Sequence, residues 1–361
     1  MEKYRVGIVG ATGMVGQRFI SLLKDHPWFE VNCVAASARS ASKTYREAVG
    51  ERWAFSWEIP EKVAGMTVVD AADIDEVSKH VDFVFCAVDM KKDEIRALEE
   101  AYAKHEIPVV SNNSACRGIE DVPMVVPEIN ADHLAVIEAQ KKRLGTKNGF
   151  IAVKPNCSIQ SYVPALTPLL DFEPEKVSVC TYQAISGAGK TFKTWPEMVD
   201  NVIPYIGGED EKSENEPLKL WGHVEDGKIV NATLPVISAQ CLRVACSDGH
   251  MAAVSVSFKK KPTIEQIKER WANYETEAQR LELPSAPKPF LQYFEDPSRP
   301  QTRLDRDFQN GFGVSIGRLR EDKLFDYRFV CLSHNTVRGA AGGGILTAEL
   351  LCRKGYIPHR V

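Results

Sequence analysis

Cys157 is the residue whose type and setting point most directly to chemistry. It lies in the stretch KPNCSIQ (residues 154–160), where Pro155 and Asn156 precede an apolar run that predicts a helix over 158–170. A thiolate at a helix start is stabilised by the helix dipole, which lowers the thiol pKa and makes the sulfur a nucleophile. A single cysteine is otherwise a small buried hydrophobe, so the rest of the sequence decides between the two interpretations.

Candidate partners for this sulfur lie in the second half of the chain. A thiol of ordinary pKa is only a few per cent ionised at neutral pH, so it needs a base, and His250 in SDGHMAA can supply one. The planar guanidinium of Arg243 can hold a carboxylate with two parallel hydrogen bonds. The stretch GGEDEK (207–212) adds Glu209 and Lys212, which share one side of the chain if the segment is helical.

A nucleotide site is predicted near the N-terminus. GATGMVGQ (10–17) follows an apolar strand and opens a helical pattern over 14–23, so its glycines let the backbone approach a pyrophosphate at the helix start. Thr12 replaces the middle glycine of the usual fingerprint. The loop ASARSASK (36–43) has no carboxylate, and its hydroxyls, arginine and lysine suit a 2′-phosphate, which favours NADP over NAD. The residues expected to contact this cofactor are Gly10, Thr12, Gly13, Met14, Val15, Ser37, Arg39, Ser40 and Lys43.

The elements that must position these residues alternate in the first third of the chain. Strands are predicted at 5–9, 31–35, 81–88 and 107–110, with helices at 14–23 and 93–105. This alternation is typical of βαβ units and predicts a Rossmann-like, doubly wound parallel sheet. Later strands at 177–184, 252–258, 313–319 and 325–332 have irregular connections, which predicts an α+β domain with a mixed sheet. A final helix is predicted over 339–351.

Composition excludes several classes of function. The chain has 361 residues, enough for two domains, and a net charge of −4, which offers no basic surface for nucleic acid. No apolar run approaches the roughly 18 residues needed to cross a bilayer, and we interpret the apolar start as a strand and not a signal peptide. Nine cysteines without a CxxC spacing argue against a disulfide framework or zinc site. We therefore expect no metal and a reducing, cytoplasmic location.

Eight segments in register resemble aspartate-semialdehyde dehydrogenases of the archaeal and fungal branch. They are GATGMVGQRF, ASARSASK, SNNSACR, PNCSIQ, TYQAISGAGK, PYIGGEDEK, CLRVACSDGHMAAV and HNTVRGAAGG, and they span nearly the whole chain. The resemblance implies interconversion of L-aspartyl-4-phosphate and L-aspartate-4-semialdehyde with NADP and inorganic phosphate, through a thioester on Cys157. It also implies that the product feeds lysine or diaminopimelate, threonine, methionine and isoleucine biosynthesis.

The resemblance also assigns roles to individual residues. The nucleophile, the acid/base residue and the residue that orients the substrate are Cys157, His250 and Gln183. The residues expected to bind substrate or phosphate are Arg243, Glu209, Lys212, Arg117 and Asn113. Arg243 would hold the α-carboxylate and Glu209 the α-ammonium group, although Asp210 and Glu211 remain alternatives for the latter. Further cofactor contacts are expected from Ser186, Gly187 and Asn335.

Domain boundaries and assembly follow from the same resemblance. Residues 1–154 and 335–361 would form the NADP-binding domain, and residues 155–334 a catalytic and dimerisation domain. A homodimer or homotetramer is expected.

Two other functions stay open. A related phosphorylating dehydrogenase, of the glyceraldehyde-3-phosphate or N-acetylglutamyl-phosphate type, would share the cysteine and histidine but would not need an acid such as Glu209. A nucleotide-sensing protein without catalysis would be expected to lose Cys157 or His250, and both are present.

Overall fold

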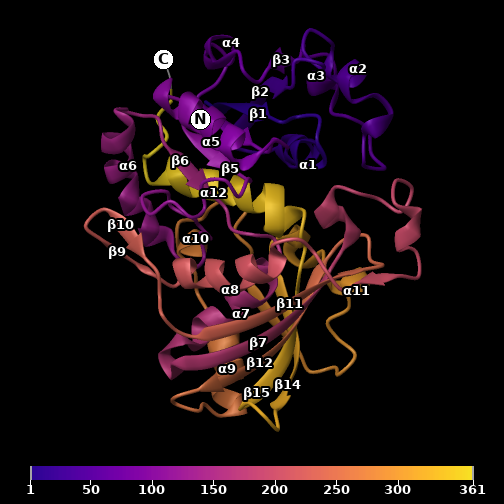
Figure 1. Cartoon of the computed structure of the whole chain (residues 1–361), viewed down its shortest axis with the longest axis vertical. Helices are drawn as coiled ribbons and strands as arrows, with labels where there is room; N and C mark the ends of the chain where they lie inside the picture. Colours follow the sequence, from indigo (N-terminus) through magenta and orange to yellow (C-terminus); the bar gives the residue numbers. More distant parts are fainter. Residues whose placement is uncertain (1, 360–361) are drawn as a thin grey trace.

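The computed structural model describes residues 2–359 and contains two large sheets of different construction (Figure 1). The first has six parallel strands in the order β3-β2-β1-β4-β5-β6. These strands are β1 (Tyr4–Val9), β2 (Phe29–Ala36), β3 (Val69–Asp70), β4 (Phe83–Cys86), β5 (Val109–Ser111) and β6 (Ile151–Val153). The strand order reverses between β1 and β4, the point at which doubly wound sheets bind their ligands. The predicted Rossmann-like sheet is thus confirmed.

Both faces of this sheet are covered by helices, which explains why most residues of its central strands are apolar and buried. The helices are α1 (Met14–Leu23), α2 (Tyr45–Val49), α3 (Glu61–Ala64), α4 (Ile74–Ser78), α5 (Lys92–Lys104), α6 (Ile137–Leu144) and α12 (Gly342–Arg353). Phe83 and Phe85 belong to a core cluster with α1 and α12, whereas Val84 and Cys86 belong to the cluster on the other face. Figure 1 shows the C-terminal α12 among elements of the first sheet, so the chain returns to that sheet at its end.

The second sheet is mixed, as predicted, with seven strands in the order β13-β14-β15-β12-β7-β11-β8. They are β7 (Pro174–Gln183), β8 (Val202–Ile203), β11 (Val236–Val244), β12 (His250–Phe258), β13 (Leu291–Phe294), β14 (Val314–Glu321) and β15 (Tyr327–Ser333). The β7–β11 and β13–β14 pairs are parallel and the other pairs antiparallel. A separate hairpin joins β9 (His223–Glu225) and β10 (Lys228–Val230). The helices of this region are α7 (Ile159–Leu166), α8 (Glu209–Leu220), α9 (Ile264–Ala272), α10 (Glu277–Arg280) and α11 (Thr302–Asp305).

Two predicted helices have different ends in the structure. The helix predicted over 158–170 is α7, which stops at Leu166 and continues as a tighter 3-10 helix over Thr167–Phe172. Pro168 has no N–H to donate to the carbonyl four residues earlier, so the α-helical pattern ends before it. The helix predicted over 339–351 begins only at Gly342, after an irregular π-type turn over Val337–Ala341.

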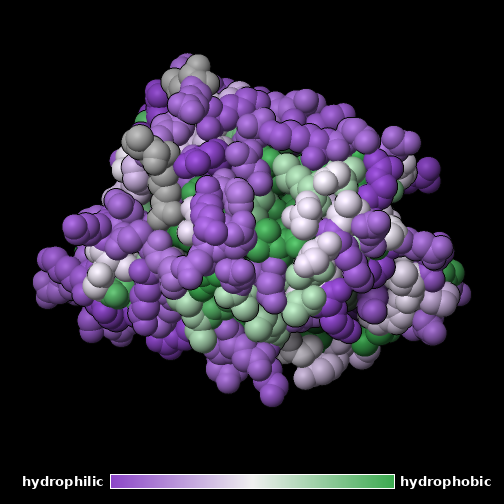
Figure 2. All heavy atoms as spheres, turned by 90° about the horizontal axis from the view of Figure 1, so that it is seen from above, coloured by the Kyte–Doolittle hydropathy of each residue, from purple (hydrophilic) through white to green (hydrophobic). Residues whose placement is uncertain are grey.

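Several further features of the described chain bear on function. Figure 2 looks onto the first-sheet end of the molecule, where hydrophilic side chains cover most of the surface and hydrophobic ones gather near a central hollow. Within residues 2–359, no helix is long and apolar enough to cross a membrane. Over the same residues, no group of three His, Cys, Asp or Glu side chains could hold a metal ion. All nine cysteines fall in this range and are unpaired thiols.

Candidate active site

Cys157 lies in the turn that connects β6 to α7, two residues before the helix begins. Its side chain is partly exposed, and its Sγ lies 3.5 Å from Nε2 of His250. The returning C-terminal segment packs directly against it, because a Cβ added at Gly339 would lie only 2.9 Å from the Cβ of Cys157. The sulfur and the imidazole, which are far apart in the sequence, are therefore in contact at a site that solvent can reach.

One edge of the second sheet brings three of the predicted residues together. Gln183 and Arg243 are register partners near the carboxyl ends of the parallel strands β7 and β11. His250 is the first residue of β12, which runs antiparallel to β7, so the start of β12 lies at the same edge. Nη1 of Arg243 donates to the carbonyl of Ala184 (2.6 Å). A Cβ at Gly187 would lie 2.9 Å from that Nη1, so the turn after β7 packs closely over this edge.

His250 is fully buried and is held in one orientation by the backbone. The N–H of Ala184 donates to its Nδ1 (3.1 Å), so in the neutral ring the proton lies on Nε2 and faces the sulfur of Cys157. Burial lowers the pKa of His250 to about 3, and the positive charge of Arg243 acts in the same direction. The imidazole is therefore neutral at physiological pH and presents an N–H donor to the reaction centre.

The predicted low pKa of Cys157 is wrong for this structure. Burial raises the pKa of Cys157, and the carboxylate of Glu209 raises it as well. The cations Lys154, Arg243 and Arg117 lower it, but they do not offset the loss of hydration. Ionisation of this thiol therefore depends on the neighbouring cations.

Glu209 is the acidic residue of GGEDEK that faces the site. It begins α8, is 7% exposed, and its carboxylate accepts hydrogen bonds from Lys212 (2.8 Å), Gln183 (3.1 Å) and Asn156 (3.0 Å). Burial opposes its ionisation, but Lys212 and the two amides outweigh burial and lower the pKa of Glu209. The other two acids point elsewhere: Asp210 accepts the N–H of Cys241 in β11 (2.8 Å), and Glu211 is exposed. This geometry favours Glu209 over both alternatives.

Arg117 follows β5 and is 8% exposed. Its Nη1 donates to Glu216 (2.9 Å) and its Nη2 to the carbonyl of Asn112 (3.2 Å), whereas its buried Nε has no hydrogen-bond partner in the described part of the chain. Each Nη carries a second N–H, so within the described residues these two nitrogens are the groups of Arg117 that can still bind an anionic ligand. The amide of Asn113 instead donates to the buried carboxyl of Glu99 (3.0 Å), so it is turned toward α5.

The predicted cofactor residues line a hollow of about 570 Å³ at the carboxyl ends of β1, β2 and β4. Its walls contain Gly10, Thr12, Gly13, Ser37, Arg39, Ser40 and Lys43. Gly10 has φ +89°, and a Cβ there would lie 2.3 Å from the carbonyl oxygen of Ala87, so glycine is required at this turn. The sequence reasoning missed Arg52, Asp89 and Met90, which also line the hollow.

The remaining cofactor predictions fall where the two sheets meet. Met14 and Ser186 line a smaller hollow of about 160 Å³, together with Arg18. Asn335 is buried and joins two parts of the site, because its Oδ1 accepts the N–H of Gly249 (2.8 Å) and its Nδ2 donates to Ser186 (2.9 Å). Val15 follows Met14 on α1.

Four polar residues of the site escaped sequence reasoning. They are Lys154, Asn156, Glu216 and Lys219, and all lie within the cluster around Arg117, Glu209 and Cys157. Lys154 is 2% exposed, and burial together with the charge of Arg117 lowers its pKa to about 7. No sequence signal separates these four residues from ordinary polar surface residues, except that KPN immediately precedes Cys157.

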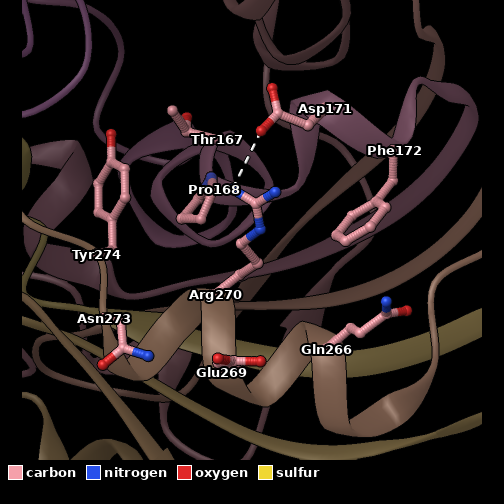
Figure 3. Close-up of a pocket in the computed structure, with 9 residues that line it drawn as sticks. All are labelled: Thr167, Pro168, Asp171, Phe172, Gln266, Glu269, Arg270, Asn273 and Tyr274. Carbon is pink, nitrogen blue, oxygen red and sulfur yellow. Dashed lines mark ion pairs between the residues drawn. The ribbon is translucent and has the colours of Figure 1, made fainter.

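A hollow of about 530 Å³ elsewhere is unrelated to this chemistry (Figure 3). It lies between the 3-10 helix after α7 and α9, and the ion pair between Arg270 and Asp171 (3.0 Å) crosses it. Its lining residues are Thr167, Pro168, Asp171, Phe172, Gln266, Glu269, Arg270, Asn273 and Tyr274, and the predicted site residues are not among them.

Comparisons with known proteins agree with this arrangement. Residues 5–137 match the family model of the semialdehyde dehydrogenase NAD binding domain, and residues 166–338 match that of the semialdehyde dehydrogenase dimerisation domain. Aspartate-semialdehyde dehydrogenase of Schizosaccharomyces pombe is 45% identical over 359 residues, which are 98% of this chain and 99% of that protein. The Archaeoglobus fulgidus enzyme is 43% identical over 357 residues, 98% of this chain and 100% of its own. The crystal structure of the Candida albicans enzyme with NADP has a TM-score of 0.89 at 38% identity, and the match covers 99% of this chain and 100% of that one. This chain therefore belongs to the aspartate-semialdehyde dehydrogenase family and is an enzyme of that family.

Proposed function

We propose that this enzyme interconverts L-aspartyl-4-phosphate and L-aspartate-4-semialdehyde, with NADP and inorganic phosphate, through a thioester on Cys157. The observation that carries the proposal is the set of groups around the sulfur. Nε2 of His250 lies 3.5 Å from Sγ, and two opposite charges lie beside Gln183, because Arg243 is its register partner and Glu209 accepts its amide N–H. A free amino acid presents a carboxylate and an ammonium group, which is the complementary pair.

Substrate and phosphate would be held by separate side chains. The guanidinium of Arg243 suits the α-carboxylate, and the ionised Glu209 suits the α-ammonium group. We assign phosphate to the two remaining cations of the site: each Nη of Arg117 keeps a second N–H beside its bond to Glu216 or to Asn112, and Lys212, whose Nζ lies 2.8 Å from Glu209, supplies the other charge. Glu209 also favours this substrate over glyceraldehyde-3-phosphate and N-acetylglutamyl phosphate, because neither of those has a free ammonium group.

The hollow beside α1 fits NADP. A backbone turn that only glycine tolerates would accept the pyrophosphate, and Arg39 and Lys43 would face the 2′-phosphate. The Candida albicans relative was solved with NADP, which supports this choice. When bound, NADPH supplies the hydride that reduces the acyl carbon.

The chain's own groups account for the remaining steps in the reductive direction. The Cys157 thiolate, favoured by Lys154 and Arg243, attacks the acyl carbon; a C–S bond forms, the C–O bond breaks, and phosphate leaves with its electron pair. After reduction the former carbonyl oxygen carries the negative charge, and Nε2–H of His250 donates a hydrogen bond to it. The C–S bond then breaks, and the sulfur regains its electron pair as the aldehyde forms.

His250 transfers no proton in this sequence: the Cys157 thiol loses its proton to solvent before it attacks, and the departing phosphate takes up a proton from solvent. The proposed role of His250 is therefore hydrogen-bond donation, in place of the acid/base role expected from the sequence, because the bond from Ala184 keeps Nδ1 unprotonated.

The test is phosphate-dependent NADPH formation from L-aspartate-4-semialdehyde, with glyceraldehyde-3-phosphate as the competing substrate. We expect turnover only with the first substrate and only when phosphate is present. The variant Cys157→Ser should be inactive, since a serine alkoxide is barely available near neutral pH. Turnover in that variant at the wild-type rate would refute the thioester.

The domain division, assembly and location are part of the same proposal. We assign NADP binding to residues 1–154 and 335–361, and catalysis and self-association, as a homodimer or homotetramer, to residues 155–334. The match to a dimerisation domain supports this assignment, as do the large exposed apolar side chains of Tyr182, Val199, Val202, Tyr205 and Val236. Unpaired thiols suit the cytoplasm. The product would enter biosynthesis of lysine or diaminopimelate, threonine, methionine and isoleucine.

A further inference from the structure

Helix α8 carries a stripe of alternating charge toward the active site. Glu209, Lys212, Glu216 and Lys219 follow one another at spacings of three and four residues, so they lie on one face of the helix. The first two belong to the proposed substrate site. The other two contact the segments that carry Arg117 and Cys157, and the proposed reaction does not yet use them.

Glu216 joins two parts of the site through one carboxylate. Its Oε1 accepts a hydrogen bond from Nη1 of Arg117 (2.9 Å), and its Oε2 accepts the backbone N–H of Asn156 (2.6 Å), the residue before Cys157. The Glu216 side chain is 11% exposed and that of Arg117 is 10% exposed, so water competes little for these bonds. The carboxylate thus fixes the distance between the guanidinium and the turn that carries the nucleophile.

Lys219 anchors the backbone of the same arginine. Its Nζ donates to the carbonyls of Arg117 (2.7 Å), Ile119 (2.7 Å) and Val122 (3.0 Å). Arg117 is therefore held by α8 at both ends, with its main chain on Lys219 and its guanidinium on Glu216. A guanidinium group fixed in this way loses little conformational freedom when an anion binds.

We propose that Glu216 is a positioning residue that orients Arg117 toward the phosphoryl group and holds it in register with Cys157. Nη1 donates one N–H to Glu216 and Nη2 donates one to the carbonyl of Asn112, so each of these nitrogens keeps a second N–H for the anion. The inference rests on the proposed phosphorylating function. It makes a prediction of definite sign, because a negative charge beside a phosphate site would by itself weaken phosphate binding. Removal of that charge should weaken phosphate binding only if Glu216 positions Arg117.

The test is the nearly isosteric variant Glu216→Gln, assayed for the KM of inorganic phosphate. Both partners of Glu216 are N–H donors, and an amide has one acceptor oxygen, so at least one of the two bonds is lost. We expect the KM for phosphate to rise about tenfold or more, with a smaller change in the KM for the semialdehyde and an unchanged Kd for NADP. The matched control is Glu214→Gln on the same helix. Among residues 2–359 its carboxylate accepts only the N–H of Ala239 (3.0 Å), so its loss should leave all three constants unchanged.

The same experiment separates a positioning role from a general structural one. A KM for phosphate that is unchanged or lower in a Glu216→Gln protein with the wild-type melting temperature would overturn the proposal. If that variant does not fold, Glu216→Asp keeps both acceptor oxygens on a shorter stem, and it should still raise the KM for phosphate selectively.

A second measurement does not depend on turnover. Inorganic phosphate should protect Cys157 from iodoacetamide in the wild type at lower concentrations than in Glu216→Gln. Absence of phosphate-dependent turnover in the wild type would refute the proposed function and not the role of Glu216. Equal protection of the two proteins would overturn the role of Glu216.

Discussion

The role of Glu209 gives the sharpest prediction, because its removal should affect two substrates in opposite directions. The carboxylate is buried, ionised and surrounded by donors, and in the proposed complex it faces the α-ammonium group. Loss of a charged hydrogen bond costs about 1.5–3 kcal/mol, so Glu209→Gln should lower kcat/KM for aspartate semialdehyde roughly 10- to 150-fold. The same carboxylate raises the pKa of Cys157, so its loss should increase the thiolate fraction.

Succinate semialdehyde separates these two effects, because it lacks the α-amino group. With this substrate Glu209→Gln should be at least as active as the wild type, and iodoacetamide should label Cys157 faster at neutral pH. The assay is NADPH formation with each aldehyde at saturating phosphate. Glu211→Gln, which removes an exposed charge from the same helix, is the matched control. Equal losses with both aldehydes would show that Glu209 supports the fold of the site, and no loss with either would refute ammonium recognition.

Three other outcomes test the remaining parts of the site. Arg243→Lys should raise the KM for the semialdehyde about tenfold with little change in the Kd for NADP, because an ammonium cannot replace the planar fork; an unchanged KM would place the carboxylate elsewhere. Arg39→Ala should shift the NADP/NAD preference roughly tenfold toward NAD, measured as the ratio of kcat/KM values, and an unaltered ratio would remove Arg39 from the 2′-phosphate site. Burial lowers the pKa of His250 to about 3, whereas an unfolded chain binds this proton near pH 6.5, so folding stability falls as the pH drops below 6.5. At pH 5 the lowered pKa of His250 reduces the free energy of unfolding by about 2 kcal/mol. The variant His250→Asn lacks this effect, so its melting temperature should fall less than that of the wild type between pH 7 and 5. Parallel falls would contradict a neutral His250.

Local sequence patterns were enough to predict the helices and strands in which the apolar residues follow a regular pattern. The helix over Met14–Leu23 has the predicted ends, because its apolar face repeats every three or four residues and the glycines before it stop the strand. Strands β1, β2 and β4 were predicted because burial on both faces leaves continuous apolar runs. Strand β11 was not predicted. Its exposed face carries Val236 beside Ser238 and Gln240, and its buried face ends in Arg243, so the alternation of apolar and polar residues is incomplete. Its pairing with β7 is also a long-range contact.

The charged segment 207–217 shows the limit of such reasoning. Its composition predicts a solvated loop and a helix start, yet it forms most of α8, a helix that buries Glu209 and Lys219. A charged residue is stable in the interior only when a partner from another segment satisfies it, and no local pattern reveals that partner. Glu216 and Lys154 were missed for the same reason.

The amino-acid sequence by itself determined the class of this protein: a βαβ nucleotide domain, a reactive cysteine and the residue types that a phosphorylating aldehyde dehydrogenase requires. These depend on local spacing and on motifs, which are properties of short segments. The tertiary structure alone decided how the reactive groups are tuned. Burial raises the pKa of Cys157 where a helix dipole was expected to lower it, the Ala184 N–H selects the tautomer of His250, and α8 holds Arg117 from both ends. Each of these effects depends on hydration lost and partners gained when distant segments meet, and so each arises only in the folded chain.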